Sequence, residues 1–222
     1  MSERIVAVVP IRSLRDGKTR LAPVLSVEAR AALLRRVAER VMDAAMRSGV
    51  VETVLVVSLD PDVLDWAANF GDPVVPLPQP ADWPGLNGAI GAGREWATER
   101  GAARLLSLFA DLPLVAAEDL RAMTERVEPV VLGPDRRGEG TNALLLRLAG
   151  GGADFRFSFG QGSLRRHLAE AARLRLPATT FVSRGIGFDL DTPADWNDFL
   201  DAVCGDGGAV SAPLAPGGVC AG

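Results

Sequence analysis

The chain has very few of the side chains on which most enzyme mechanisms depend. Among its 222 residues there is one histidine, His167, and no tyrosine. A zinc site built from several histidines is therefore excluded, and a histidine-based catalytic triad is not expected. If the chain is an enzyme, its chemistry must come from carboxylates, cations and backbone amides.

Cysteine and long apolar runs are also scarce. The two cysteines, Cys204 and Cys220, lie near the C-terminus and form neither a disulfide framework nor a zinc-binding spacing, which suits a reducing compartment. The apolar run from Ile5 to Val9 is too short for a signal peptide, and no stretch approaches the length of a membrane span. We expect a cytoplasmic protein with no membrane partner.

Positive charge is not in excess. Lysine and arginine total 24 against 28 acidic residues, a net charge of −4, so we expect no nucleic-acid partner. With 48% hydrophobic and 23% charged residues, the composition is typical of a globular protein. We predict one domain over residues 1–204 and a disordered tail, rich in glycine, alanine and proline, over residues 205–222.

Apolar runs typical of buried strands alternate with segments of helical periodicity. The predicted strands are residues 4–10, 51–58, 73–76, 104–109, 129–133, 142–147, 155–159 and 178–183. The predicted helices are residues 27–48, 61–70, 88–100, 116–127, 163–174 and 192–203. This alternation predicts a three-layer α/β fold with a mainly parallel, mixed sheet. Ligands of such sheets bind at the carboxyl ends of the strands.

A basic loop follows the first predicted strand. It runs from Pro10 to Leu21 and carries the cations Arg12, Arg15, Lys18 and Arg20. Backbone amides and cations of this kind can hold a triphosphate, although a solvated basic loop is the alternative. The segment Gly17-Lys18-Thr19 is not a P-loop, because Arg12 stands where that motif needs glycine.

Three aspartates occupy positions at which strands end. Asp111 follows the strand at residues 104–109, and Asp189 and Asp191 are two apart on an extended segment, so their side chains project together. Carboxylates are ligands that Mg²⁺ prefers. The alternatives are a turn or capping role for Asp111 and an N-cap role for Asp191.

Three glycine-containing segments could contact ligands. One segment, Phe159-Gly-Gln-Gly-Ser163, lies at the start of a predicted helix. Together with Gly138-Glu-Gly-Thr-Asn142 it is a candidate binding site for phosphate or carboxylate. The alternative is that Ser163 is only an N-cap. In Pro84-Gly-Leu-Asn-Gly88, Asn87 could face a purine edge, whereas the glycines could serve only close packing.

Taken in order, these segments resemble one known family. They are Pro10 with Lys18-Thr-Arg-Leu21, Gly85-Leu-Asn87, Ala110-Asp-Leu-Pro113, Gly140-Thr-Asn-Ala-Leu144, Phe159-Gly-Gln-Gly-Ser163 with His167, and Asp189-Leu-Asp-Thr-Pro193. The series resembles the 2-phospho-L-lactate / phosphoenolpyruvate guanylyltransferases of coenzyme F-420 biosynthesis, from about Val6 to Leu200.

The resemblance implies a Rossmann-like nucleotidyltransferase fold and transfer of GMP from GTP to a small phosphorylated three-carbon acid, with release of pyrophosphate. It implies Mg²⁺ held by Asp111, Asp189 and Asp191, and an acceptor held by Thr141, Gly160 and Ser163. The catalytic residues it implies are Lys18, Arg20 and Asp111. The nucleotide-binding residues it implies are Pro10, Arg12, Lys18, Gly85 and Asn87. The family more often has lysine where this chain has Arg12, which leaves the role of that position open.

The sequence is compatible with several alternatives. The chain could be another Mg²⁺-dependent nucleotidyltransferase, of sugar-phosphate or molybdopterin type, or a glycosyltransferase that uses Asp189-x-Asp191. It could also be a nucleotide-binding module without turnover. The acceptor could be phosphoenolpyruvate, 2-phospho-L-lactate or 3-phosphoglycerate. The oligomeric state, a homodimer included, is not fixed by the sequence.

Overall fold

The computed structural model describes residues 3–205. Its strands are β1 (Ile5–Pro10), β2 (Thr53–Ser58), β3 (Val74–Pro78), β4 (Arg104–Leu108), β5 (Val130–Pro134), β6 (Thr141–Arg147) and β7 (Ala178–Thr180). Its helices are η1 (Thr19–Leu21), α1 (Val27–Arg47), α2 (Pro61–Ala68), α3 (Gly85–Glu99), α4 (Ala117–Thr124), η2 (Gly152–Asp154), α5 (Ser163–Arg173), α6 (Arg184–Gly187) and α7 (Pro193–Gly205). The tail was expected over residues 205–222; Gly205 ends α7, and the rest lies outside the described residues.

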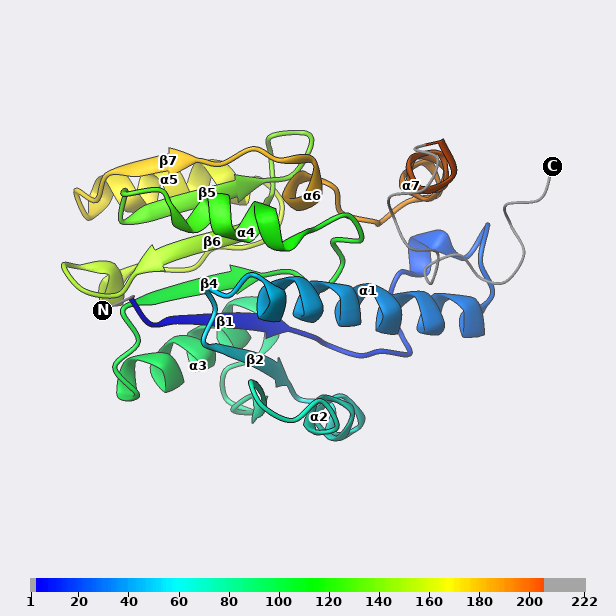
Figure 1. Ribbon diagram of the computed structural model, residues 1–222, viewed down its shortest axis with the longest axis horizontal. Helices are drawn as coiled ribbons and strands as arrows, with labels where there is room; N and C mark the ends of the chain where they lie inside the picture. Colours follow the sequence, from blue (N-terminus) through cyan, green and yellow to red (C-terminus); the bar gives the residue numbers. More distant parts are fainter. Residues whose placement is uncertain (1–2, 206–222) are drawn as a thin grey trace.

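The strands form one seven-stranded sheet in the order β3-β2-β1-β4-β6-β5-β7 (Figure 1). Neighbouring strands run parallel except where β6 pairs antiparallel with β4 and with β5. The expectation of a mainly parallel, mixed sheet is therefore confirmed. Because β1, β2, β3 and β4 run in the same direction, their carboxyl ends share one edge of the sheet, and the loops that follow them converge there.

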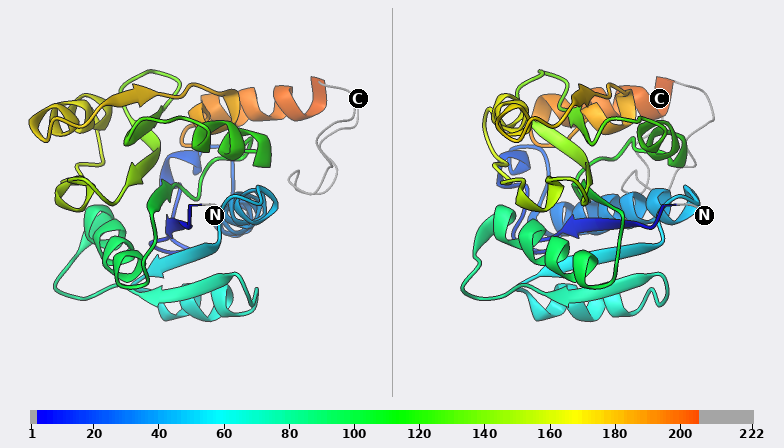
Figure 2. Two further views of the ribbon diagram at one scale, coloured as in Figure 1. Left: turned by 60° about the vertical axis from the view of Figure 1, so that its left-hand side comes forward. Right: turned by 90° about the vertical axis from the view of Figure 1, so that its left-hand side faces the viewer.

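Helices cover both faces of the sheet and make the three layers (Figure 2). Alternate residues of β1 point to opposite faces, so Ala7 packs against α1 whereas Val8 packs toward α3. Helices α1, α2 and α4 contribute to the first core, and α3 and α5 contribute to the second. The close approach of α3 depends on Gly93, because a Cβ there would lie 2.5 Å from the side chain of Val8.

A third apolar cluster anchors the basic loop that follows β1. Leu21, at the end of η1, is fully buried and belongs to a cluster with Leu33 of α1 and with Trp196 and Phe199 of α7. Burial of a leucine of this size stabilises its position by about 1.5–3 kcal/mol. The C-terminal helix thus fixes the loop that carries Lys18 and Arg20.

Several details of the sequence-based prediction are wrong, and one is that β7 ends at Thr180 and not at residue 183. Residues 155–159 form no strand, because their amides bond to side chains instead: the N–H groups of Arg156, Ser158 and Phe159 donate to Glu170, His167 and Asn87. Helix α3 begins at Gly85, three residues before its predicted start at residue 88. The expected N-cap of α1 is confirmed, since the Ser26 hydroxyl accepts the N–H of Ala29.

No helix within the described part of the chain combines the length and the apolar character that a membrane span requires.

Candidate active site

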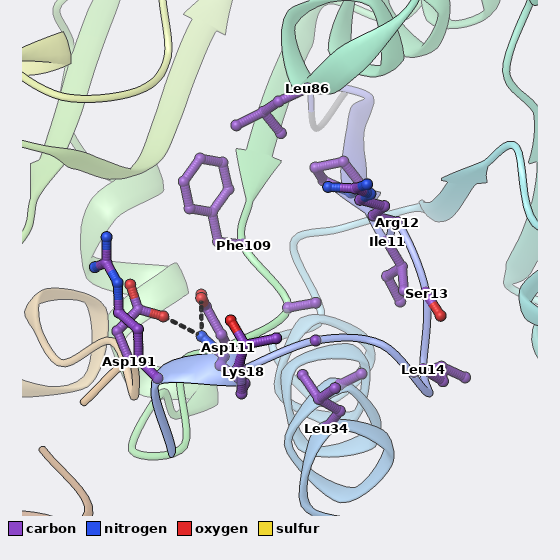
Figure 3. A pocket seen from close by; sticks show the side chains of 16 residues that line it. Ile11, Arg12, Ser13, Leu14, Lys18, Leu34, Leu86, Phe109, Asp111 and Asp191 are labelled. Carbon is purple, nitrogen blue, oxygen red and sulfur yellow. Dashed lines mark hydrogen bonds and ion pairs between the residues drawn. The ribbon is translucent and has the colours of Figure 1, made fainter. Parts of the chain in front are cut away.

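Two adjoining cavities open where the carboxyl ends of the parallel strands meet. The first, of about 480 Å³, lies over the loop after β1 and includes Lys18, Asp111 and Asp191 (Figure 3). The second, also about 480 Å³, includes Thr141, Gly160, Ser163, Asp189 and Asp191. Four residues line both cavities, namely Arg20, Leu86, Phe109 and Asp191. Two ligands bound in these cavities would meet beside Asp191 and Arg20.

In the first cavity, Lys18 lies between two carboxylates, one of which, Asp191, lines both cavities. Its Nζ donates to Asp111 Oδ2 at 2.6 Å and to Asp191 Oδ1 at 2.5 Å, and its side chain is only 10% exposed. Burial disfavours the ammonium, but the two carboxylates more than offset this cost and raise the pKa of Lys18. Lys18 therefore carries a fixed positive charge where the strands bring the aspartates together.

Three observations test whether a divalent cation fits these aspartates. Asp111 Oδ1 is buried and has no hydrogen-bond partner within the described residues. The pKa of Asp189 is raised, first by burial and then by the charges of Asp111 and Asp191, so a further cation nearby would be favourable. Within residues 3–205, no three acidic, histidine or cysteine side chains converge closely enough to hold an ion by themselves. The site fits a cation that also takes ligands from a bound phosphate, as Mg²⁺ usually does.

The position of Asp191 is set by the start of α7. The carboxylate of Asp195 accepts the N–H groups of Asp191 and Thr192, and the Thr192 hydroxyl accepts the N–H of Asp195. Arg136 forms ion pairs with Asp195 and Asp198 and thereby ties this turn to the loop before β6. The alternative that Asp191 caps the helix is wrong, because Thr192 and Asp195 make the capping bonds and Asp191 faces Lys18.

The hydroxyl groups of Thr141 and Ser163 lie side by side in the second cavity. Thr141 begins β6 and Ser163 begins α5, and their Oγ atoms are 3.2 Å apart. The N-cap of α5 is Gly162, so the alternative that Ser163 is an N-cap is wrong. Gly160 and Gly162 have φ angles of 113° and 69°, which favour glycine and let the chain turn sharply into α5.

His167 lies beneath these hydroxyls. It is completely buried, and its ring nitrogens contact Thr141 Oγ1 at 3.2 Å and the N–H of Ser158 at 3.0 Å. Burial, and then the nearby charge of Arg166, lower the pKa of His167 to about 4. The imidazole is therefore neutral near pH 7.

The remaining residues predicted to bind the nucleotide line cavities beside the loop after β1, except for Asn87. Pro10 and Arg12 line the first cavity and, with Gly85, a neighbouring cavity of about 550 Å³ that also includes Gln79. Asn87 does not present its carbonyl oxygen to these cavities, because Asn87 Oδ1 accepts the N–H of Phe159 at 2.8 Å. Asn87 thus links the start of α3 to the loop that carries Gly160.

Sequence reasoning missed Arg136 and Asp195, and it did not assign a role to His167. Arg136 stands beside Arg137 just before the glycine-containing segment Gly138–Asn142, and two adjacent cations in that position were an available signal. Asp195 follows Thr192 at the spacing of a capping box, which also could have been found. The burial of His167 against Thr141 depends on the tertiary structure and left no signal in the sequence.

Comparison with known proteins gives several close matches. A phosphoenolpyruvate guanylyltransferase from Rubrobacter xylanophilus is 41% identical over 86% of this chain and 91% of its own length. One from Sphaerobacter thermophilus is 38% identical over 86% of this chain and 89% of its own length. A 3-phospho-D-glycerate guanylyltransferase from Phenylobacterium zucineum is 32% identical over 90% of this chain and 91% of its own length.

Solved structures share the fold at much lower identity. A nucleotidyl transferase from Methanothermobacter thermautotrophicus superposes with a TM-score of 0.62 at 19% identity, covering 90% of this chain and 97% of that one. A protein from Mycobacterium tuberculosis, crystallised in complex with manganese, gives a TM-score of 0.58 at 16% identity, covering 90% of this chain and 99% of that one. The model of the family described as "Guanylyl transferase CofC like" matches residues 5–208. The chain belongs to this family of CofC-like guanylyl transferases.

Proposed function

We propose that this protein transfers GMP from GTP to the phosphate group of a small phosphorylated three-carbon acid, with release of pyrophosphate, in coenzyme F-420 biosynthesis. The observation that carries the proposal is the pair of adjoining cavities that share Arg20 and Asp191, with Lys18 and Asp111 beside Asp191 in the first of them. One cavity suits a triphosphate, and the other suits a small anion. Phosphoenolpyruvate is the first acceptor to test, since the relatives with 38% and 41% identity carry its name.

The proposed reaction needs no general base. An oxygen of the acceptor's phosphate attacks the α-phosphorus of GTP and forms a new P–O bond. The bond from the α-phosphorus to the oxygen that bridges to the β-phosphorus breaks, and pyrophosphate leaves with that electron pair. A phosphate monoester has its second pKa near 6, so the nucleophilic oxygen is already deprotonated at neutral pH. The single, buried, neutral His167 is consistent with this chemistry.

The residues at the junction then supply position and charge. Lys18 and Arg20 neutralise negative charge on the triphosphate, as cations do in other phosphoryl-transfer sites. Asp111, Asp189 and Asp191 would hold Mg²⁺ together with phosphate oxygens of the nucleotide. A bound Mg²⁺ supplies Lewis-acid stabilisation of negative charge on those oxygens.

On the nucleotide side, Pro10, Arg12 and Gly85 lie where the ribose and the base would bind. Asn87 belongs to this side by sequence position, and its bond to Phe159 indicates that it connects the nucleotide site to the acceptor loop. On the acceptor side, Thr141, Gly160 and Ser163 provide hydroxyl and backbone donors. Donors that converge on an anion hold it in one orientation, which raises the rate of attack.

The test is a matrix of four nucleoside triphosphates against four acceptors, read by pyrophosphate release with Mg²⁺. The acceptors are phosphoenolpyruvate, 2-phospho-L-lactate, 3-phosphoglycerate and, as a control, glucose 1-phosphate. We expect release only with GTP and one or more of the three-carbon acids. Equal use of ATP would contradict the guanine preference. Release with the sugar phosphate alone would favour a sugar-phosphate nucleotidyltransferase.

A further inference from the structure

His167 makes one hydrogen bond through each ring nitrogen, and one of them fixes its protonation pattern. The backbone N–H of Ser158 lies 3.0 Å from Nε2, and a backbone N–H can only donate. Nε2 must therefore be the acceptor nitrogen. Because the ring is neutral, its single proton belongs on Nδ1, 3.2 Å from the Thr141 hydroxyl oxygen.

This proton decides how many donors the two hydroxyl groups can offer to the cavity. Thr141 and Ser163 have one hydroxyl proton each, and one of the two is used in the bond between their Oγ atoms. With Nδ1–H donating to Thr141, the second hydroxyl proton remains for the cavity. With the proton on Nε2 instead, Thr141 would have to donate to Nδ1, and the pair would present only lone pairs.

We propose that His167 is a positioning residue that, as the Nδ1–H tautomer, donates to Thr141 and thereby turns one hydroxyl proton of the Thr141–Ser163 pair toward the anionic acceptor. This inference rests on the proposed function for the nature of the acceptor. An anion that meets a hydroxyl donor is bound, whereas an anion that meets two lone pairs is repelled. The tautomer of His167, which does not line the cavity, thus decides whether Thr141 and Ser163 present a hydrogen-bond donor or only lone pairs to the acceptor.

The surroundings of His167 keep this arrangement fixed. The ring is enclosed by Phe155 and Phe159, with ring centroids 5.9 Å and 4.6 Å away. The charged groups that influence it are Arg166, which lowers its pKa, and Glu170, which opposes that effect. Glu170 is itself engaged by Arg173 and by the N–H of Arg156, so its negative charge is offset and stabilises a protonated ring only weakly.

The tautomer can be measured directly in the unmodified protein. Because the sequence has one histidine, protein labelled with ¹⁵N-histidine gives ring-nitrogen NMR signals from His167 alone. The expected spectrum has a directly attached proton on Nδ1 and an unprotonated Nε2, unchanged between pH 6 and 8. A proton on Nε2, or a cationic ring in that range, would overturn the proposal regardless of any kinetic result.

Two substitutions of His167 by side chains of nearly equal shape test the role of the Nδ1–H donor. His167→Asn and His167→Leu both lose the acceptor for the Ser158 N–H, but only asparagine can place an N–H near the position of Nδ1. We expect His167→Leu to raise the acceptor KM by about ten- to a hundredfold, since a hydrogen bond to a charged group is lost, with the GTP KM unchanged. His167→Asn should keep the acceptor KM within about threefold of the unmodified value, because the donor is retained.

The outcomes separate this proposal from the proposed function. Equal acceptor KM values for the two variants would overturn the role of the donor, even if both turn over GTP. If the unmodified protein releases no pyrophosphate with any three-carbon acid, the proposed function has failed. The NMR spectrum, which needs no substrate, still decides the tautomer in that case, and it also decides it if both variants fail to fold.

Discussion

The two halves of the candidate site are organised by different forces. At the junction beside β1 and β4, the positions are set by full charges, with Lys18 between Asp111 and Asp191. In the second cavity, which we propose for the acceptor, they are set by neutral hydrogen bonds, through Thr141, Ser163 and His167. Ion pairs act over a distance and tolerate small shifts, whereas hydrogen bonds between neutral groups require a defined direction.

The difference matches what each half would have to bind. A triphosphate with its cation has several negative charges spread over many oxygens, so counter-charges matter more than the orientation of any one bond. A small acid with a phosphate and a carboxylate must be held in one orientation for its phosphate to attack. We therefore expect substitutions in the charged half to affect turnover and metal dependence, and those in the neutral half to affect the acceptor KM.

The largest effect is expected from removing a carboxylate at the junction. Asp111→Asn should lower turnover by about a thousandfold or more, because stabilisation by a metal ion contributes several kcal/mol, and Asp189→Asn should do the same. The fold should persist, since neither side chain is part of an apolar core. Turnover would be measured at limiting Mg²⁺, with Asp43→Asn on the exposed face of α1 as the matched control. Near-normal turnover in either variant would remove that residue from the site.

A somewhat smaller effect is expected from removing the central cation. Lys18→Met should lower turnover by about a hundredfold, in the range found when one charge-stabilising donor is lost. It also leaves Asp111 and Asp191 facing each other without neutralisation, which costs about 1–3 kcal/mol of stability at this partly exposed site.

Added Mg²⁺ should then raise the melting temperature of Lys18→Met more than that of the unmodified protein, because the ion restores the missing charge. Arg15→Met is the matched control, since Arg15 lies in the same loop and pairs with Asp62 at the surface. If Mg²⁺ raised the melting temperature of all three proteins equally, Lys18 and the ion would not share the same carboxylates.

In the neutral half, Ser163→Ala should raise the acceptor KM by about ten- to a hundredfold while the GTP KM stays constant. The control is Ser26→Ala, which removes the N-cap of α1 and should cost about 1 kcal/mol of stability without changing acceptor kinetics. A Ser163→Ala variant that loses stability but keeps its acceptor KM would place the acceptor elsewhere.

The smallest expected effect is a gain in the stability of Asp189→Asn, the same variant that should lose turnover. The pKa of Asp189 is raised, first by burial, so its ionised form is unfavourable in the folded protein without metal. This cost is absent at low pH, where the carboxyl group is protonated in both states, and is complete at neutral pH. Asp189→Asn should therefore be slightly more stable than the unmodified protein at pH 7 without metal, by an amount that solvent screening at this partly exposed site keeps small.

The difference in melting temperature between Asp189→Asn and the unmodified protein should shrink as the pH falls toward 4. Added Mg²⁺ should reverse the sign of this difference, because the aspartate carboxylate binds the ion and the asparagine amide does not. Thermal unfolding at several pH values, with and without Mg²⁺, measures both trends. An Asp189→Asn variant that is less stable at pH 7 would indicate that this carboxylate is structural.

Much of the fold could be predicted because the strands are continuous apolar runs and the helices carry caps. Residues Ile5 to Pro10 and the helix after Ser26 were predicted nearly to the residue. Phe155, Phe157 and Phe159 alternate with polar residues and so wrongly predict a strand over residues 155–159. Burial on one side does not require a neighbouring strand when side chains such as His167 and Glu170 satisfy the amides. The antiparallel placement of β6 is a property of the whole sheet and has no local signal.

The candidate site, like the fold, has one part that the sequence predicts and another part that it does not. Lys18 and Asp111 could be found because they follow β1 and β4, and parallel strands bring their ends together. Asp191 could be found because it is two residues from Asp189 on an extended segment. The pairing of Asn87 with Phe159 and of His167 with Thr141 joins residues that are 72 and 26 positions apart. Such contacts depend on how α3 and α5 pack, which residue spacing alone does not encode.

The central claim is that the acceptor's phosphate attacks the α-phosphorus of GTP. It can be tested with phosphoenolpyruvate, or whichever three-carbon acid is turned over, labelled with ¹⁸O in its phosphate group. The account predicts a product with two coupled ³¹P signals, an ¹⁸O atom in the bridge between its phosphorus atoms, and pyrophosphate free of the label. Label in the pyrophosphate, or a product without a P–O–P linkage, would contradict it.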